Sequence, residues 1–210
     1  MRKIGSSRAS PRRADYFWLA AGPVIAAALA ITVAIGMSVF SQSASAATAT
    51  VDLGTATPYA VLAGSTVTNT GPSVVSGDLG VSPGTAVTGF TGAPNGMVIN
   101  GTIHAGDASA ASAQSALTTA YNDAAGRTKT SSVTAPLGAG QVLGPGVYKA
   151  TSGLEVGGSL TLTGDASAVF IFQAGSTLIV DTGTTIKLAG GAQACNVFWQ
   201  VGSSATLKSC

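Results

Sequence analysis

The segment F-Q-A-G-S-T-L-I-V, from Phe172 to Val180, indicates a repeating fold, because two variants of it occur elsewhere in the chain. Y-K-A-T-S-G-L-E-V, from Tyr148 to Val156, precedes it by 24 residues, and W-Q-V-G-S-S-A-T-L, from Trp199 to Leu207, follows it by 27. The three segments superpose without gaps. A repeat of about 25 residues, made of short β-branched and aromatic runs, is typical of the coils of a β-solenoid.

A second repeat has nearly the same offset. G-S-L-T-L-T-G, ending at Gly164, matches T-T-I-K-L-A-G, ending at Gly190, 26 residues later. A β-sandwich with an insertion is the alternative fold, but it gives no reason for offsets that stay between 24 and 27.

Alternate residues of a strand face opposite sides, so each repeat predicts which side chains point into the core. The inward columns are Leu154, Leu178 and Ala205; Val156, Val180 and Leu207; Leu160 and Ile186; and Leu162 and Leu188. The outward positions are Gly153, Thr177 and Ser204; Glu155, Ile179 and Thr206; Thr161 and Lys187; and Thr163 and Ala189. The two groups of outward positions belong to two different sides.

A third side is apolar on both parities of its strands, as in A-V-F-I-F-Q (168–173) and N-V-F-W-Q-V (196–201). Strands with this pattern are buried on both faces, so another element must cover them. Apolar residues recur at helical spacing only over about 107–125, with Gly126 as a stop signal. Its inward residues are Ala110, Ala113, Leu117, Ala120, Tyr121 and Ala124. We therefore predict a mainly β, three-sided solenoid with one long α-helix packed along the aromatic side.

The N-terminus has the pattern of a secretory signal. Five basic residues precede an apolar run over 17–40, and an A-x-A site follows at Ala44 and Ala46. We predict cleavage after Ala46 and a single domain over 47–210. The apolar run is also long enough to span a bilayer, so a membrane anchor through 17–40 is the alternative if the signal stays uncleaved.

Composition and charge argue against several classes of function. Only 9% of residues are charged, and 47–210 holds five basic and seven acidic side chains, so no basic patch is left to bind nucleic acid. The seven carboxylates are scattered singly along the sequence, with no pair aligned between coils, which argues against an enzyme. His104 is the only histidine and lacks partners at metal-ligand spacing, so we expect a capping or surface role for it. We predict no catalytic residue, metal, cofactor or small-molecule substrate.

Several long motifs carry a family resemblance. They are S-G-D-L-G-V-S-P-G-T-A-V-T-G-F (76–90), the helical passage, L-G-P-G-V-Y (143–148), and the two aromatic strands, all in the expected order over 51–208. The chain strongly resembles the microbial ice-binding protein family. The resemblance implies a discontinuous right-handed β-helix of triangular section, secretion, the absence of enzymatic activity, and binding of ice crystals through one flat, Thr/Ser-rich β-face.

The resemblance also implies where ice binds, because the family often carries T-[A or G]-x-[T or N] on this face. Matches here are Thr85–Thr88, Thr88–Thr91 and Thr182–Thr185. Candidate ice-binding residues are Thr177, Ile179, Ser204, Thr206, Thr182, Thr185, Thr161 and Thr163. The side with Thr177 and Thr206 is favoured, because Lys187 occupies the side with Thr161; Glu155 is a charge on the favoured side.

The sequence leaves three questions open: the function, the completeness of the last coil and the pairing of the cysteines. A secreted β-solenoid of this kind could instead be a cell-surface adhesion or structural module. The coil that ends at Cys210 lacks the strand that follows it in the previous coil, so we expect further strands to be missing there. Cys195 and Cys210 map to consecutive corners, and whether they pair depends on the geometry of those corners.

Overall fold

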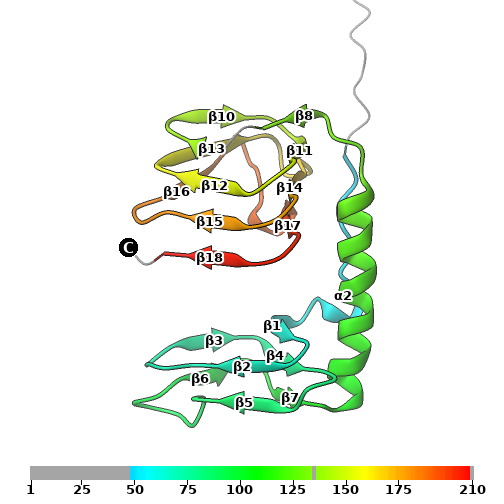
Figure 1. The fold of residues 1–210 in the computed structure, drawn as a ribbon, viewed down its shortest axis with the longest axis vertical. Coiled ribbons are helices and arrows are strands. Elements are labelled where there is room, and N and C mark those ends of the chain that lie inside the picture. The colour runs from blue at the N-terminus through cyan, green and yellow to red at the C-terminus, as the bar shows by residue number, and fades with distance from the viewer. Residues whose placement is uncertain (1–47, 134–135, 209–210) are drawn as a thin grey trace, which may run out of the picture. The chain divides into compact units, whose positions relative to one another are not determined.

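The computed structural model of the protein describes residues 48–133 and 136–208. Contacts divide the chain into Met1–Ser45 and Ala46–Cys210, and every described residue belongs to the second unit. The predicted signal, its cleavage site and the alternative anchor lie outside the described residues. The described part is mainly β, with short parallel strands and one long helix, α2 (Figure 1).

The C-terminal part of the chain forms a stack of three parallel sheets, visited in cyclic order. The helix-side sheet has the order β17 (Val197–Val201), β14 (Phe170–Ala174), β11 (Gly146–Ala150), β8 (Ser131–Ser132). The second sheet has the order β18 (Ala205–Leu207), β15 (Leu178–Val180), β12 (Leu154–Gly157), β9 (Leu137–Gly138). The third sheet has the order β10 (Gln141–Leu143), β13 (Ser159–Thr163), β16 (Thr185–Ala189). A short 3-10 helix, η3 (Ala194–Asn196), precedes β17.

The N-terminal part forms a smaller stack with the same cyclic order. After the 3-10 helix η2 (Gly54–Ala56), its helix-side sheet has the order β1 (Tyr59–Ala63), β4 (Asp78–Val81), β7 (Ile103–Ala105). Its second sheet pairs β2 (Thr66–Thr68) with β5 (Ala86–Thr88), and its third sheet pairs β3 (Val74–Ser76) with β6 (Met97–Ile99). The 24 to 27-residue repeat of the C-terminal stack did not reveal this second stack.

Strand registers in the C-terminal stack confirm the predicted columns. Leu154 pairs with Leu178, which pairs with Ala205, and Val156, Val180 and Leu207 align in the same way. The third sheet aligns Leu160 with Ile186 and Leu162 with Leu188. Leu154, Val156, Leu160 and Leu162 are at most 1% exposed, so the offsets read from the sequence correspond to true stacking of strands.

Strand β14 buries both of its faces, as predicted, whereas β17 is half-buried along its whole length. Phe170 and Phe172 point into the core of the stack, whereas Val169 and Ile171 form a second cluster with Ala120 and Ala124 of α2, among other residues. The aromatic rings of Tyr148, Phe172 and Trp199 form one stacked column, with centroid separations of 5.3 and 4.1 Å. The helix therefore covers the aromatic side.

Helix α2 spans Ala108–Gly126, one residue later at each end than predicted. Asp107 is its N-cap, because the Asp107 side chain accepts a hydrogen bond from the Ala110 amide at 2.9 Å. Gly126 is the last helical residue, and the chain leaves the helix through an extended Arg127. Tyr121, predicted to face inward, is 40% exposed, because its hydroxyl reaches the Val201 carbonyl at the rim of the helix–sheet contact.

Gln173 fixes the C-terminal end of α2 to the sheet. This buried side chain of β14 donates from Nε2 to the carbonyl oxygens of Ala124 at 2.7 Å and Arg127 at 3.0 Å. The last carbonyls of a helix have no partner within the helix, so a side-chain donor from the sheet satisfies them. A polar residue in an otherwise apolar strand thus positions the helix along both stacks.

Strand β18 leaves apolar side chains exposed at one edge of the C-terminal stack. Leu207 is 73% exposed, whereas Val156, two coils away in the same column, is 0% exposed. In the third sheet, Ile186 and Leu188 of β16 are likewise more exposed than their partners in β13. Inward-facing residues are therefore buried only where a neighbouring coil covers them.

Two glycines of one loop provide a test of how tightly successive coils pack. Gly89 and Gly92 both have positive φ, 79° and 88°, but a Cβ at Gly89 would overlap the Asn69 carbonyl, whereas a Cβ at Gly92 would meet open space. We expect Gly89→Ala to cost about 1–3 kcal/mol more free energy of unfolding than Gly92→Ala, because only the former forces the coils apart. Urea denaturation of both variants measures the difference, and equal losses would contradict this packing.

Candidate functional site

The outward row of the second sheet contains the favoured candidates. Glu155, Ile179 and Thr206 lie side by side in register across β12, β15 and β18. Thr206 is exposed and Ile179 half-buried. Thr177 and Ser204 lie just before β15 and β18, so the four candidates of this side are adjacent. Neighbouring strands of a sheet lie about 4.8 Å apart, which gives the row a regular spacing.

The other candidates lie elsewhere. Thr161 and Thr163 are on β13 of the third sheet, where Thr161 pairs with Lys187. Thr185 begins β16 in register with Ser159, and Thr182 lies in the turn between β15 and β16. The Thr182–Thr185 motif therefore spans a corner and does not form part of the row with Thr206.

Sequence reasoning missed most of a second row of hydroxyls. In the N-terminal stack Thr66 pairs with Ala86 and Thr68 pairs with Thr88, and all four side chains are exposed. The Thr88 hydroxyl donates to the Thr68 hydroxyl at 3.3 Å, so the two threonines form a ladder across the strands. The motif match at Thr85–Thr88 was the available signal, but without the strand pairing nothing connected it to Thr66 and Thr68.

The structure corrects the prediction that the carboxylates are isolated. Lys208 donates from Nζ to Asp181 Oδ1 at 2.6 Å, and this hydrogen bond lowers the pKa of Asp181. The same contact with Asp181 raises the pKa of Lys208. Glu155 is in register with Ile179, two residues before Asp181, so its outward side chain lies on the same side of the sheet. Three charged side chains from three successive coils therefore meet. Their sequence spacing did not show this, because Asp181 and Lys208 follow their strands and Glu155 lies within one.

His104 lies in β7, three residues before Asp107; the N-cap of α2 is Asp107 and not His104. Its Nδ1 is 2.7 Å from Asp107 Oδ2, and its Nε2 is 4.0 Å from Asp78 Oδ2. Hydrogen bonds from the Ala110 amide and then from His104 lower the pKa of Asp107. Two carboxylates thus flank the imidazole. This is a second place where carboxylates predicted to be isolated lie close together. Both of them also accept backbone amides, Asp78 from Thr102 and Asp107 from Ala110, which is a structural task.

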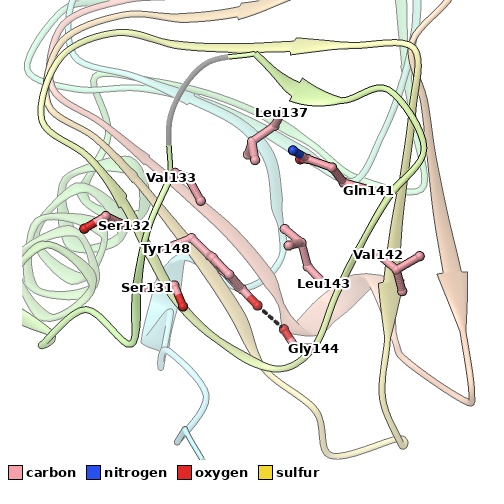
Figure 2. Close-up of a pocket in the computed structure, with 9 residues that line it drawn as sticks. All are labelled: Ser131, Ser132, Val133, Leu137, Gln141, Val142, Leu143, Gly144 and Tyr148. Atoms are coloured by element: carbon pink, nitrogen blue, oxygen red, sulfur yellow. Dashed lines mark hydrogen bonds between the residues drawn. The ribbon is translucent and has the colours of Figure 1, made fainter.

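A cavity of about 380 Å³ lies at the β8–β10 end of the C-terminal stack (Figure 2). Its lining mixes neutral polar and apolar groups: Ser131, Ser132, Val133, Leu137, Gln141, Val142, Leu143, Gly144 and Tyr148. Figure 2 shows the Tyr148 hydroxyl directed at Gly144, whose carbonyl oxygen accepts its hydrogen bond at 2.6 Å. Burial raises the pKa of Tyr148, the one ionisable residue of the lining. This lining offers no acid–base pair for catalysis.

Further observations concern metals, membranes and thiols. Within 48–133 and 136–208, no three or more His, Cys, Asp or Glu side chains come close enough together to hold a metal ion. Over the same residues, no helix is both long enough and apolar enough to cross a bilayer. Cys195 is exposed, and the question of its pairing with Cys210 lies outside the described residues.

Comparison with known proteins places the chain in a family. The family model described as Ice-binding-like matches residues 61–210. The chain is 46% identical over 175 residues to an ice-binding protein of Nostoc sp. (strain HG1), covering 82% of this chain and 63% of that protein. It is 36% identical over 172 residues to an ice-binding protein of Flavobacterium frigoris (strain PS1), covering 76% of this chain and 61% of that protein.

A solved structure agrees with the sequence comparison. The crystal structure of an ice-binding protein from an Antarctic biological consortium superposes with a TM-score of 0.72 and 46% identity, covering 78% of this chain and 73% of the other. The chain belongs to the Ice-binding-like family. It spans about three fifths of the length of the Nostoc and Flavobacterium proteins.

Proposed function

We propose that this protein is secreted and adsorbs to ice crystals, inhibiting their growth or recrystallisation, without enzymatic activity. Its relatives named as ice-binding proteins support the proposal. In this account the two stacks are parts of one discontinuous, right-handed, three-sided β-solenoid, and α2 packs along one side of both. Contacts of α2 with β1, β4, β7, β14 and β17 support this arrangement.

The ice-binding face in this proposal is the side formed by the second sheets of both stacks, which we call the second side. In each stack the second sheet follows the helix-side sheet in the chain, and Figure 1 draws β2 and β5 below β12, β15 and β18 along the stacking direction. The observation that carries the proposal is the exposed Thr68–Thr88 ladder. A threonine offers a hydroxyl beside a methyl group, and the sheet repeats this pair at about 4.8 Å, a flat template that can order water.

Thermal hysteresis of the purified protein tests the function. We expect a gap between the melting and freezing points of ice and faceted crystals within that gap, because adsorbed protein blocks growth of the planes it covers. A protein that leaves round ice discs growing freely at the melting point, at concentrations where it is folded by circular dichroism, would refute the proposed function.

A further inference from the structure

The charged cluster of Glu155, Asp181 and Lys208 lies on the second side. Glu155 is an outward residue of β12, in register with Ile179 and Thr206, and is exposed. Asp181 and Lys208 come directly after β15 and β18. The cluster therefore extends from Glu155, within the row of outward side chains, to the C-terminal ends of the neighbouring strands. The cluster has two negative charges and one positive charge.

The N-terminal stack presents a different surface on the same side. Its second sheet exposes Thr66, Thr68, Ala86 and Thr88, and the sequence has no Asp, Glu, Lys or Arg between residues 53 and 77 or between 79 and 103. The second side is thus chemically divided into an uncharged part on β2 and β5 and a charged part on β12, β15 and β18.

Charged groups are poor partners for an ice lattice. A carboxylate or an ammonium group binds its own water molecules strongly, and stripping that water from an unpaired charge costs far more than desolvating a hydroxyl. Lys208 can neutralise one carboxylate at 2.6 Å, which leaves one negative charge in excess within the row. Water around that charge is oriented toward the ion and not along a lattice.

We propose that the Glu155–Asp181–Lys208 cluster keeps the C-terminal part of the second side off the ice, so that β2 and β5 make the ice contact. The inference rests on the proposed function and assigns Glu155 as the residue that limits the area of contact. Thr206, Ser204, Thr177 and Ile179 then lie beside the contact and become part of it once the charge is removed.

The test compares the thermal hysteresis of Glu155→Thr with that of the wild type at equal concentration. Removing the excess charge adds the β12, β15 and β18 row to the contact, and we expect hysteresis to rise about twofold, in proportion to the added area. A triple variant that also carries Asp181→Thr and Lys208→Thr should rise at least as much. Lys187→Thr, which removes an exposed charge from the third sheet, is the matched control and should leave hysteresis unchanged.

The possible results distinguish a failure of this inference from a failure of the proposed function. An active wild type whose hysteresis does not change in either Glu155 variant, with both variants folded by circular dichroism, overturns the inference and leaves the function standing. A wild type without hysteresis whose Glu155→Thr variant gains it overturns the assignment of the wild-type ice contact to β2 and β5, and shows only that the Glu155 charge blocks β12, β15 and β18. Absence of hysteresis in the wild type and in both variants overturns the inference and the function together.

Discussion

Replacement of Phe172 by alanine is expected to lower the free energy of unfolding by about 3–5 kcal/mol, the largest effect of any substitution considered. Phe172 is 1% exposed, and its ring is stacked between Tyr148 and Trp199 in the centre of the C-terminal stack. Alanine would leave a cavity that the flanking strands cannot close, because β11 and β17 are held in register on both sides. Urea or thermal denaturation followed by circular dichroism measures the loss.

Two controls define how the Phe172 result is interpreted. Phe172→Leu retains most of the volume and should lose clearly less than the alanine variant. Val142→Ala removes a side chain that is 63% exposed and should change stability by less than about 0.5 kcal/mol. A Phe172→Ala variant as stable as Val142→Ala would mean that the aromatic column does not form the core.

The second large effect concerns the Thr68–Thr88 ladder. We expect the double variant Thr68→Tyr and Thr88→Tyr to reduce thermal hysteresis by roughly an order of magnitude, because the exposed ladder is the proposed contact surface. Both side chains are exposed and opposite each other, so two phenol rings would hold the sheet away from a flat crystal plane. Tyrosine is favourable in strands, so folding should be preserved.

Thr163→Tyr is the matched control for the ladder. Thr163 is an exposed threonine of β13 in the third sheet, and it was a candidate in its own right from the sequence. Hysteresis should stay at the wild-type level in this variant. A large loss in Thr163→Tyr with none in the double variant would move the ice contact to the third sheet.

The C-terminal stack could be predicted from the sequence because its coils repeat. The segments that begin at Tyr148, Phe172 and Trp199 superpose without gaps, and their pairing in the structure follows that superposition. The covering helix could also be predicted, since strands apolar on both parities need a partner on each face. The helix bounds were one residue early, because Asp107 caps the helix from outside it.

The N-terminal stack and the charged cluster could not be predicted in the same way. Strands β2, β3, β5 and β6 have three residues each, too few for a clear period, and the pairing of Thr68 with Thr88 depends on the turns between them. The charged cluster forms only if the side chains of Asp181 and Lys208, which follow their strands, point toward the side that carries Glu155. Strand periodicity fixes the face of a residue but does not fix contacts beyond the ends of a strand.

Capture of the protein in growing ice is a direct measure of adsorption through β2 and β5. Fluorescently labelled wild-type protein and the Thr68→Tyr and Thr88→Tyr double variant are each frozen slowly from dilute solution, and the labelled fraction within the ice is measured. We expect the wild type to be incorporated into the ice and the double variant to be left in the liquid. Exclusion of the wild type, or equal incorporation of both proteins, would contradict this expectation.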